Sequence, residues 1–126
     1  MAVTVTNSTI AALNTEQTFT ANAATSTAVN TAEVFTFTPT KAGSKIALNF
    51  SNLGSTAAVT YSIAAGDLWA GKAITGTIAG SAQEILQFDS ARVLQDDGTV
   101  AITVTPSTGT ILLGDHAFKL YALELL

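Results

Sequence analysis

Apolar residues alternate with threonine and other small polar residues along most of this chain, and this pattern limits its fold more than any other feature. The clearest runs contain these apolar residues: Val3 and Val5; Phe35 and Phe37; Ile46, Leu48 and Phe50; Val59, Tyr61 and Ile63; Val100, Ile102 and Val104. Successive side chains of a β-strand point to opposite faces, so each run predicts a strand with one apolar and one polar face. Because helical periodicity is hard to find, the sequence predicts an all-β fold.

Turn-forming residues separate these runs, in the segments 39–43, 52–55, 65–67, 79–81, 96–98 and 106–109. Their spacing of roughly 8 to 15 residues predicts a single-domain β-sandwich, jelly-roll-like, of about eight to ten short antiparallel strands. The sharpest signal is the pair Asp97 and Gly98, between the expected strands 91–95 and 99–105. Glycine supplies the positive φ that tight hairpins need, so we expect a hairpin there.

The length of 126 residues suits one domain with one core. We expect residues 1–24 to form an N-terminal arm or the first strands, and residues 25–126 to form the sandwich. Residues 21–32 are small and polar, which indicates a long loop or a loosely held strand. Residues 118–126 are apolar on both faces, which predicts a strand covered on both sides, by this domain's own second layer or by a neighbouring subunit.

Charge is sparse, since only 11% of the residues are charged and the net charge is -4. The five basic residues are scattered, so we expect no binding to nucleic acid or to an anionic membrane. Neutral hydroxyl and amide groups must then keep the chain soluble, unless partners cover much of its surface. The sequence contains neither a signal-peptide pattern nor an apolar run long enough to span a bilayer, and we expect synthesis in the cytoplasm.

Residues that could perform catalysis or bind a metal are few. His116 is the only histidine and cysteine is absent, so we expect a surface or capping role for it rather than a zinc site. No serine lies in a Gly-x-Ser-x-Gly motif. Asp96 and Asp97 fit either a calcium site or a turn, and the turn is favoured because EF-hand spacing is absent. Asp89 and Arg92 are expected to form an ion pair. The sequence predicts no enzymatic activity, no cofactor and no metal.

Five residues are candidates for contact with a partner: Val3, Val5, Trp69, Leu123 and Leu125. The first two belong to the N-terminal segment, and the last two to the two-faced C-terminal segment. Trp69 lies in a glycine-flanked loop, where it could anchor a partner, cover the end of the sandwich or form a platform for a sugar. Pairs of the form Thr-x-Thr recur at irregular intervals, so we expect no in-register hydroxyl array of the kind that binds ice; threonine simply favours strands.

Three segments resemble small head decoration (cement) proteins of tailed bacteriophages. These are AAVTYSIAAGD at 57–67, ITGTIAGS at 74–81 and DSARVLQDDGT at 89–99. In such proteins a strand ending in Ala-Gly-Asp leads to a glycine-containing loop, an alternating strand, a Ser-Ala-Arg corner and a hairpin that closes in Asp-Gly. The likeness extends from Ala57 to Leu125, whereas the N-terminal half departs from the pattern.

The resemblance implies a β-sandwich on the outside of a virion, often a homotrimer, that binds neighbouring major capsid protein subunits and stabilises the shell. The alternative is a carbohydrate- or receptor-binding module of a fibre or adhesin, with Trp69 at its tip. An enzymatic function could involve only His116. Low charge and a two-faced C-terminal segment fit a protein that neighbours largely cover.

Overall fold

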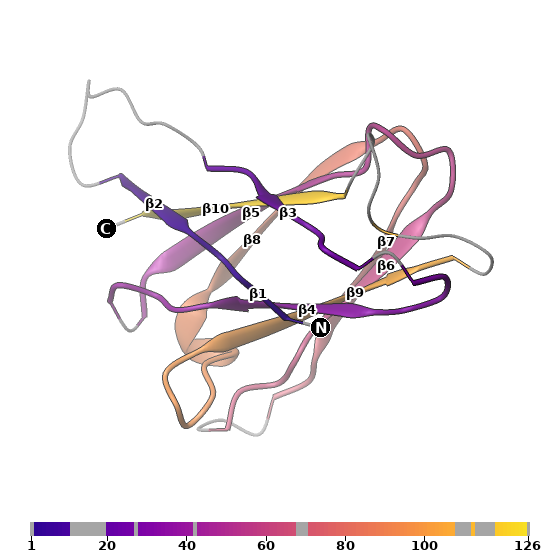
Figure 1. Ribbon diagram of the computed structural model, residues 1–126. Helices are drawn as coiled ribbons and strands as arrows, with labels where there is room; N and C mark the ends of the chain where they lie inside the picture. Colours follow the sequence, from indigo (N-terminus) through magenta and orange to yellow (C-terminus); the bar gives the residue numbers. More distant parts are fainter. Residues whose placement is uncertain are drawn as a thin grey trace.

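The computed structural model describes residues 2–10, 20–26, 28–41, 43–67, 71–107, 112 and 118–125. Within these ranges the chain forms ten strands and one 3-10 helix, and no α-helix (Figure 1). The elements are β1 (Ala2–Thr4), β2 (Asn7–Ile10), β3 (Asn22–Ala23), β4 (Glu33–Phe37), β5 (Lys45–Ser51), β6 (Val59–Ile63), β7 (Ile74–Ile78), β8 (Gln83–Asp89), η1 (Ser90–Arg92), β9 (Val100–Pro106) and β10 (Lys119–Leu125). The all-β prediction is confirmed.

The strands form two sheets. Sheet A has the order β1-β4-β9-β6-β7, and sheet B has the order β2-β10-β5-β8, with β3 also paired to β10. From β3 onward the chain passes repeatedly between the sheets. The last two strands of the chain are each inserted between two strands that precede them in the sequence. Strand β9 lies between β4 and β6, and β10 lies between β3 and β5. This connectivity is that of a jelly roll and confirms the predicted sandwich.

Two edge pairings are parallel, so the expectation of purely antiparallel strands is wrong at these positions. Strand β1 runs parallel to β4, and β2 runs parallel to β10. One extended segment supplies both edges, because the chain crosses from sheet A to sheet B at Val5 and Thr6. Parallel pairing needs a long connection between the partners, and both β1 and β2 are far from their partners in sequence.

The N-terminal residues 2–10 are therefore first strands of the sandwich. Val5 is 6% exposed and belongs to the core, and its amide donates to the carbonyl of Thr36 at 2.8 Å. Asn22 holds the crossing point, since its Oδ1 accepts from the amide of Thr6 at 2.7 Å and its Nδ2 donates to the carbonyl of Leu120 at 2.9 Å. Of the segment 21–32, expected to be a long loop or a loosely held strand, only Asn22 and Ala23 form the short strand β3, and its other described residues lie in a loop in which Ser26 is fully buried.

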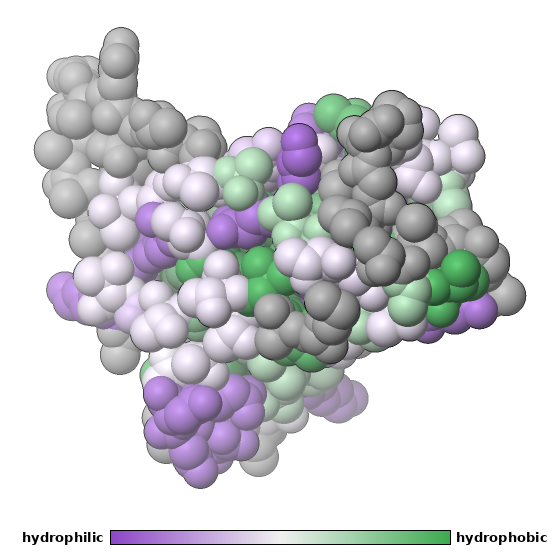
Figure 2. Space-filling view, in the orientation of Figure 1, coloured by the Kyte–Doolittle hydropathy of each residue, from purple (hydrophilic) through white to green (hydrophobic). Residues whose placement is uncertain are grey.

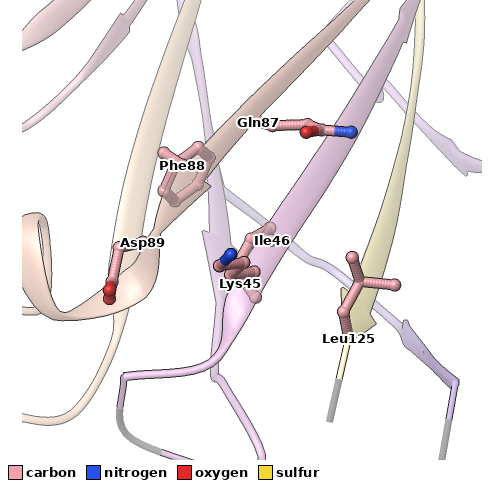
Figure 3. A pocket seen from close by; sticks show the side chains of 6 residues that line it. All are labelled: Lys45, Ile46, Gln87, Phe88, Asp89 and Leu125. Atoms are coloured by element: carbon pink, nitrogen blue, oxygen red, sulfur yellow. The ribbon is translucent and has the colours of Figure 1, made fainter.

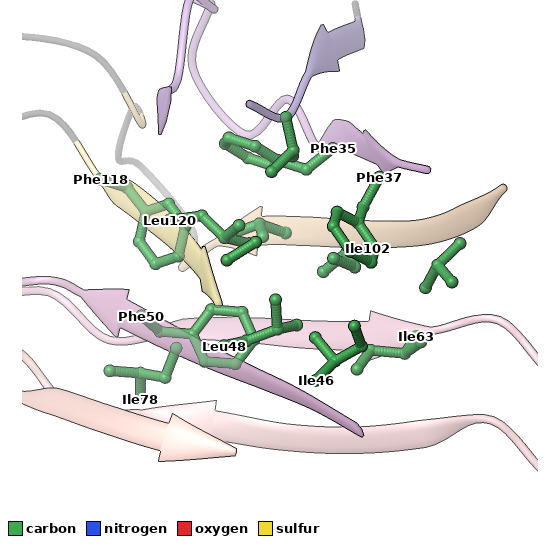
Figure 4. Packing of buried hydrophobic residues seen from close by; sticks show 14 of the residues in the cluster. Phe35, Phe37, Ile46, Leu48, Phe50, Ile63, Ile78, Ile102, Phe118 and Leu120 are labelled. Atoms are coloured by element: carbon green, nitrogen blue, oxygen red, sulfur yellow. The ribbon is translucent and has the colours of Figure 1, made fainter. Parts of the chain in front are cut away.

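The core lies between the sheets and consists of the side chains that alternation predicts to point inward (Figure 4). The buried residues among those predicted are Val5, Phe35, Phe37, Ile46, Leu48, Phe50, Val59, Ile63, Val100, Ile102 and Val104. Phe118 joins the two layers, with its ring centroid 5.9 Å from that of Phe35 in sheet A and 6.2 Å from that of Phe50 in sheet B. Such aromatic contacts add to the stabilisation that comes from burial alone.

The predicted turn at Gly98 is present, but one of its flanking strands is not. Gly98 has φ of +81° and donates its amide hydrogen to the carbonyl of Gln95 at 2.9 Å. Residues 90–92 form η1 rather than a strand, and the side chain of Asp89 caps this helix by accepting from the amide of Ala91 at 2.9 Å. The expected ion pair between Asp89 and Arg92 is not formed, although both residues lie in the described ranges; the Asp89 carboxylate caps η1 instead.

If the N-terminus is part of the core, Val5→Ala will destabilise the domain by about 2 kcal/mol, because two buried methyl groups are lost and a cavity remains. The neighbouring exposed residue provides the control, and Thr4→Ala is expected to change stability by less than about 0.5 kcal/mol. Urea unfolding followed by circular dichroism measures both values. Equal effects of the two substitutions would restore the interpretation of this segment as an arm.

Candidate interaction surface

The outward side chains of three neighbouring strands form one continuous surface, which we call the outer face of sheet B. It consists of Lys45, Ala47, Asn49 and Ser51 on β5, Gln83, Ile85, Gln87 and Asp89 on β8, and Lys119, Tyr121, Leu123 and Leu125 on β10. Because Ile46, Leu48 and Phe50 fill the core, the residues between them on β5 must point outward. The strand register therefore brings residues from distant parts of the sequence together.

Apolar side chains lie on both outer strands of this face, Ile85 on β8 and Tyr121, Leu123 and Leu125 on β10, with β5 between them. Ile85 is 70% exposed and Leu125 is 38% exposed, while Tyr121 and Leu123 are half-buried. Charged groups lie at the ends of the strands, with Lys45 paired in register to Asp89 at one end and Lys119 at the other. Exposed apolar side chains combined with charged groups at the margin are common in protein–protein contact surfaces.

A shallow pocket of about 250 Å³ lies at one end of this face, lined by Lys45, Ile46, Gln87, Phe88, Asp89 and Leu125. Figure 3 shows Asp89 of β8 and Leu125 of β10 on either side of Lys45 of β5. The volume falls below the roughly 300–1,000 Å³ of typical small-molecule sites.

The centre of the face contains an unsatisfied polar atom. Asn49 lies in register between Tyr121 and Ile85, and its Oδ1 is buried without a hydrogen-bond donor from the protein. Leaving a buried acceptor unpaired costs about 1–3 kcal/mol, so such atoms are uncommon unless they have another role.

The opposite surface, the outer face of sheet A, carries hydroxyl groups. Two rows run across β9, β6 and β7, namely Thr105, Thr60 and Thr77, and then Thr103, Ser62 and Thr75. These residues surround a hollow of about 350 Å³. Strand pairing rather than sequence spacing sets this alignment, which is why the irregular Thr-x-Thr intervals did not predict it; that the chain has no ice-binding array stays a prediction. In Figure 2, pale, weakly polar colours cover much of the visible surface.

Two buried glutamates hold the edges of the sandwich, and sequence analysis missed both. Glu124 accepts hydrogen bonds from Asn7 Nδ2 at 2.5 Å, from the amides of Thr40 and Lys41 at 2.8 and 3.0 Å, and from Ser44 Oγ at 2.5 Å. Burial raises the pKa of this carboxyl, but the hydrogen bonds from Ser44, Thr40 and Lys41 outweigh burial and lower the pKa to about 2. Glu124 therefore joins β10, β2 and the loop between β4 and β5.

Glu33 has a similar structural function in sheet A. Its carboxylate is fully buried and accepts from the amides of Thr25, at 3.0 and 2.8 Å, and Ser26, at 3.3 Å, and from the hydroxyl of Thr25. The sequence contained evidence for the burial of Glu33, because it lies two residues before Phe35 in the same alternating strand and therefore points to the same inner face as Phe35 and Phe37. Both carboxylates are occupied by structural donors, which leaves neither arranged as a general acid or base.

The predicted partner residues do not lie together in the structure. Val5 lies in the core with little surface to offer, and Val3 packs against the core. Leu123 and Leu125 lie on the outer face of sheet B, where they join Ile85, which the sequence analysis did not identify. Trp69 and His116 lie outside the described residues.

The acidic residues of the 96–98 turn have local roles. Asp97 Oδ1 accepts from the amide of Thr99 at 3.0 Å and from its hydroxyl at 2.6 Å. Asp67 Oδ2 accepts from the amide of Asp96 at 2.8 Å. These bonds favour the turn over the calcium site, and the described residues contain no group of three His, Cys, Asp or Glu that could hold a metal ion.

Comparison of the chain with protein-family models, curated proteins and solved structures finds no match. In the part of the chain that the structure describes, no helix is long and apolar enough to cross a membrane. Functional inference therefore rests on the surfaces themselves and on the resemblance of residues 57–125.

Glu124→Gln should destabilise the domain by about 2–3 kcal/mol at pH 7, because an amide cannot accept from all four donors. The pKa in the folded state lies below the ordinary value, so the carboxylate stabilises the fold above pH 4.5 and this contribution is lost as the pH falls towards 2. Urea unfolding at several pH values should therefore show the variant and the natural protein converging in acid. Glu84→Gln, at an exposed carboxylate, is the control, and a constant difference down to pH 2 would contradict the assignment.

Proposed function

We propose that this chain is a non-enzymatic structural domain that decorates the outside of a phage capsid by binding neighbouring major capsid subunits. The main support for this proposal is the outer face of sheet B, which carries exposed and half-buried apolar side chains on an otherwise weakly polar domain. The resemblance of residues 57–125 to head decoration proteins supplies the class of partner. The proposed location is the exterior of the virion, after synthesis in the host cytoplasm.

The chemistry of the face supports contact with protein rather than with a charged polymer. Its few ionic groups, Lys45, Asp89 and Lys119, lie at the ends of the strands and have mixed signs. Ile85 and Leu125 supply surface whose removal from water stabilises a complex by roughly 25 cal/mol per Å² of apolar area. The contact per chain is modest, and repetition over a shell would raise the overall strength of attachment through multivalency.

Replacing apolar side chains of this face tests this proposal. Ile85→Ser/Leu123→Ser should weaken attachment to undecorated shells by at least about tenfold, which corresponds to about 1.4 kcal/mol per site. Co-sedimentation of the purified chain with shells measures the apparent Kd. Val29→Ser, which removes another exposed apolar side chain from outside this face, is the matched control. Unchanged attachment of the double variant would contradict the use of this face.

A carbohydrate-binding function is the second candidate, and the hydroxyl-lined hollow on sheet A favours it. Thr60, Ser62, Thr75 and Thr77 present donors and acceptors without any charged neighbour in the hollow. Such a surface matches the hydroxyl groups of a neutral sugar. This site differs from the loop tip at Trp69 that the sequence suggested for the same function.

Isosteric removal of hydroxyl groups tests the second candidate. Thr60→Val/Thr77→Val should abolish binding to any neutral glycan that the natural protein retains on a glycan array, because about two hydrogen bonds are lost per ligand. Thr4→Val, at the opposite edge of sheet A, should leave that binding unchanged. An array without hits for the natural protein would eliminate the carbohydrate function.

A further inference from the structure

Strand β7 forms an open edge of sheet A. Within the described residues it pairs only with β6, so one side of its backbone has no strand partner. An unpaired edge presents a row of amide and carbonyl groups that can pair with another strand. Proteins usually block such edges with charged residues, proline, bulges or very short strands.

None of these protections is present at β7. The segment from Ala73 to Ala79 contains no charged residue and no proline, and Thr75 and Thr77 are both exposed. The other edges differ, because β8 carries Glu84 and Asp89, while β1 and β2 have only 3 and 4 residues. Among the described strands, β7 is thus the edge most open to a further strand.

The sequence of this edge is self-complementary. Residues 73–79 read Ala-Ile-Thr-Gly-Thr-Ile-Ala, which is a palindrome centred on Gly76. Two copies in antiparallel arrangement around a two-fold axis at Gly76 would place Ile74 beside Ile78 and Thr75 beside Thr77. Each residue would then face its own kind, without opposed charges, and cross-strand threonine pairs contribute roughly 0.2–1 kcal/mol each.

The packing beneath β7 keeps the centre of the strand small and firmly seated. A Cβ atom on Gly76 would lie 2.5 Å from the hydroxyl oxygen of Tyr61, so a larger residue would force the Tyr61 side chain to move. Tyr61 in turn stacks on Phe50 of sheet B, with ring centroids 4.6 Å apart. The inner face of β7 is therefore closed by this chain's own core, and no other strand of the described residues pairs with its free edge.

We propose that β7 pairs with β7 of a second copy, which joins the two sheets A into one continuous sheet across a two-fold axis. The interface is isologous, since the same strand is used on both sides, and it closes at two chains. Backbone hydrogen bonds supply the attraction, and the palindrome fixes the register. The hydroxyl rows of the two copies become one surface that passes through Thr75 and Thr77.

This dimer is distinct from the trimer that the resemblance implies, and it does not depend on the proposed function. Shell attachment was assigned to the outer face of sheet B, whereas β7 lies in sheet A. Failure of one proposal therefore leaves the other standing.

Size-exclusion chromatography with multi-angle light scattering, over a series of loading concentrations, tests the pairing. The natural protein should have twice the chain mass of 12.9 kDa. Thr75→Lys/Thr77→Lys places lysine opposite lysine at both pairs and should give a monomer. Thr75→Lys/Thr77→Glu places opposite charges together and should restore the dimer. Thr4→Lys/Thr38→Lys adds the same charge at exposed positions away from β7 and should remain dimeric.

Circular dichroism checks that each variant is folded, which is expected because all four substituted positions are exposed. A natural protein that is monomeric or trimeric at every concentration would overturn the proposal. A dimer that survives Thr75→Lys/Thr77→Lys would overturn it as well, and so would a folded Thr75→Lys/Thr77→Glu variant that stays monomeric.

Discussion

The buried carboxylate of Glu124 is the interaction on which the arrangement of the strands depends. A charge can be buried without a large cost only when hydrogen-bond donors surround it, and here Asn7, Thr40, Lys41 and Ser44 supply them. These donors come from β2 and from the loop before β5, so one carboxylate connects both ends of the chain with its middle. It also fixes register, because a slip of one residue would move this group to the surface and Leu123 into the core.

Core packing fixes the residues that point inward but not those that point outward. The outer faces of sheets A and B accordingly carry different kinds of side chain. Sheet A presents hydroxyl rows and an uncharged edge, and sheet B presents apolar side chains with ionic groups at the strand ends. The functional proposals use these surfaces separately. We propose shell attachment for one face and pairing of two copies for the edge, and the buried carboxylates hold the scaffold that presents both.

Local patterns predicted most of the fold, whereas long-range pairing could not be predicted. Alternation correctly placed Phe35, Leu48 and Ile102 in the core, and glycine chemistry correctly placed the turn at Gly98. The parallel pairings of β1 and β2 and the alignment of the hydroxyl rows depend on contacts between distant segments, which no single segment encodes. The candidate surface was partly predicted through Leu123 and Leu125, but Ile85 was missed, because only strand pairing places it on the same face, across β5 from them.

Amide hydrogen exchange in the isolated chain at pH 7, followed by NMR, tests most directly the claim that Glu124 and the N-terminal strands belong to one cooperative structure. We expect the amides of Val5, Thr40 and Lys41 to exchange as slowly as those of β5, because all of these hydrogen bonds open only in global unfolding. Rapid exchange of these three amides, while β5 stays protected, would show that the edges open independently and would contradict the account.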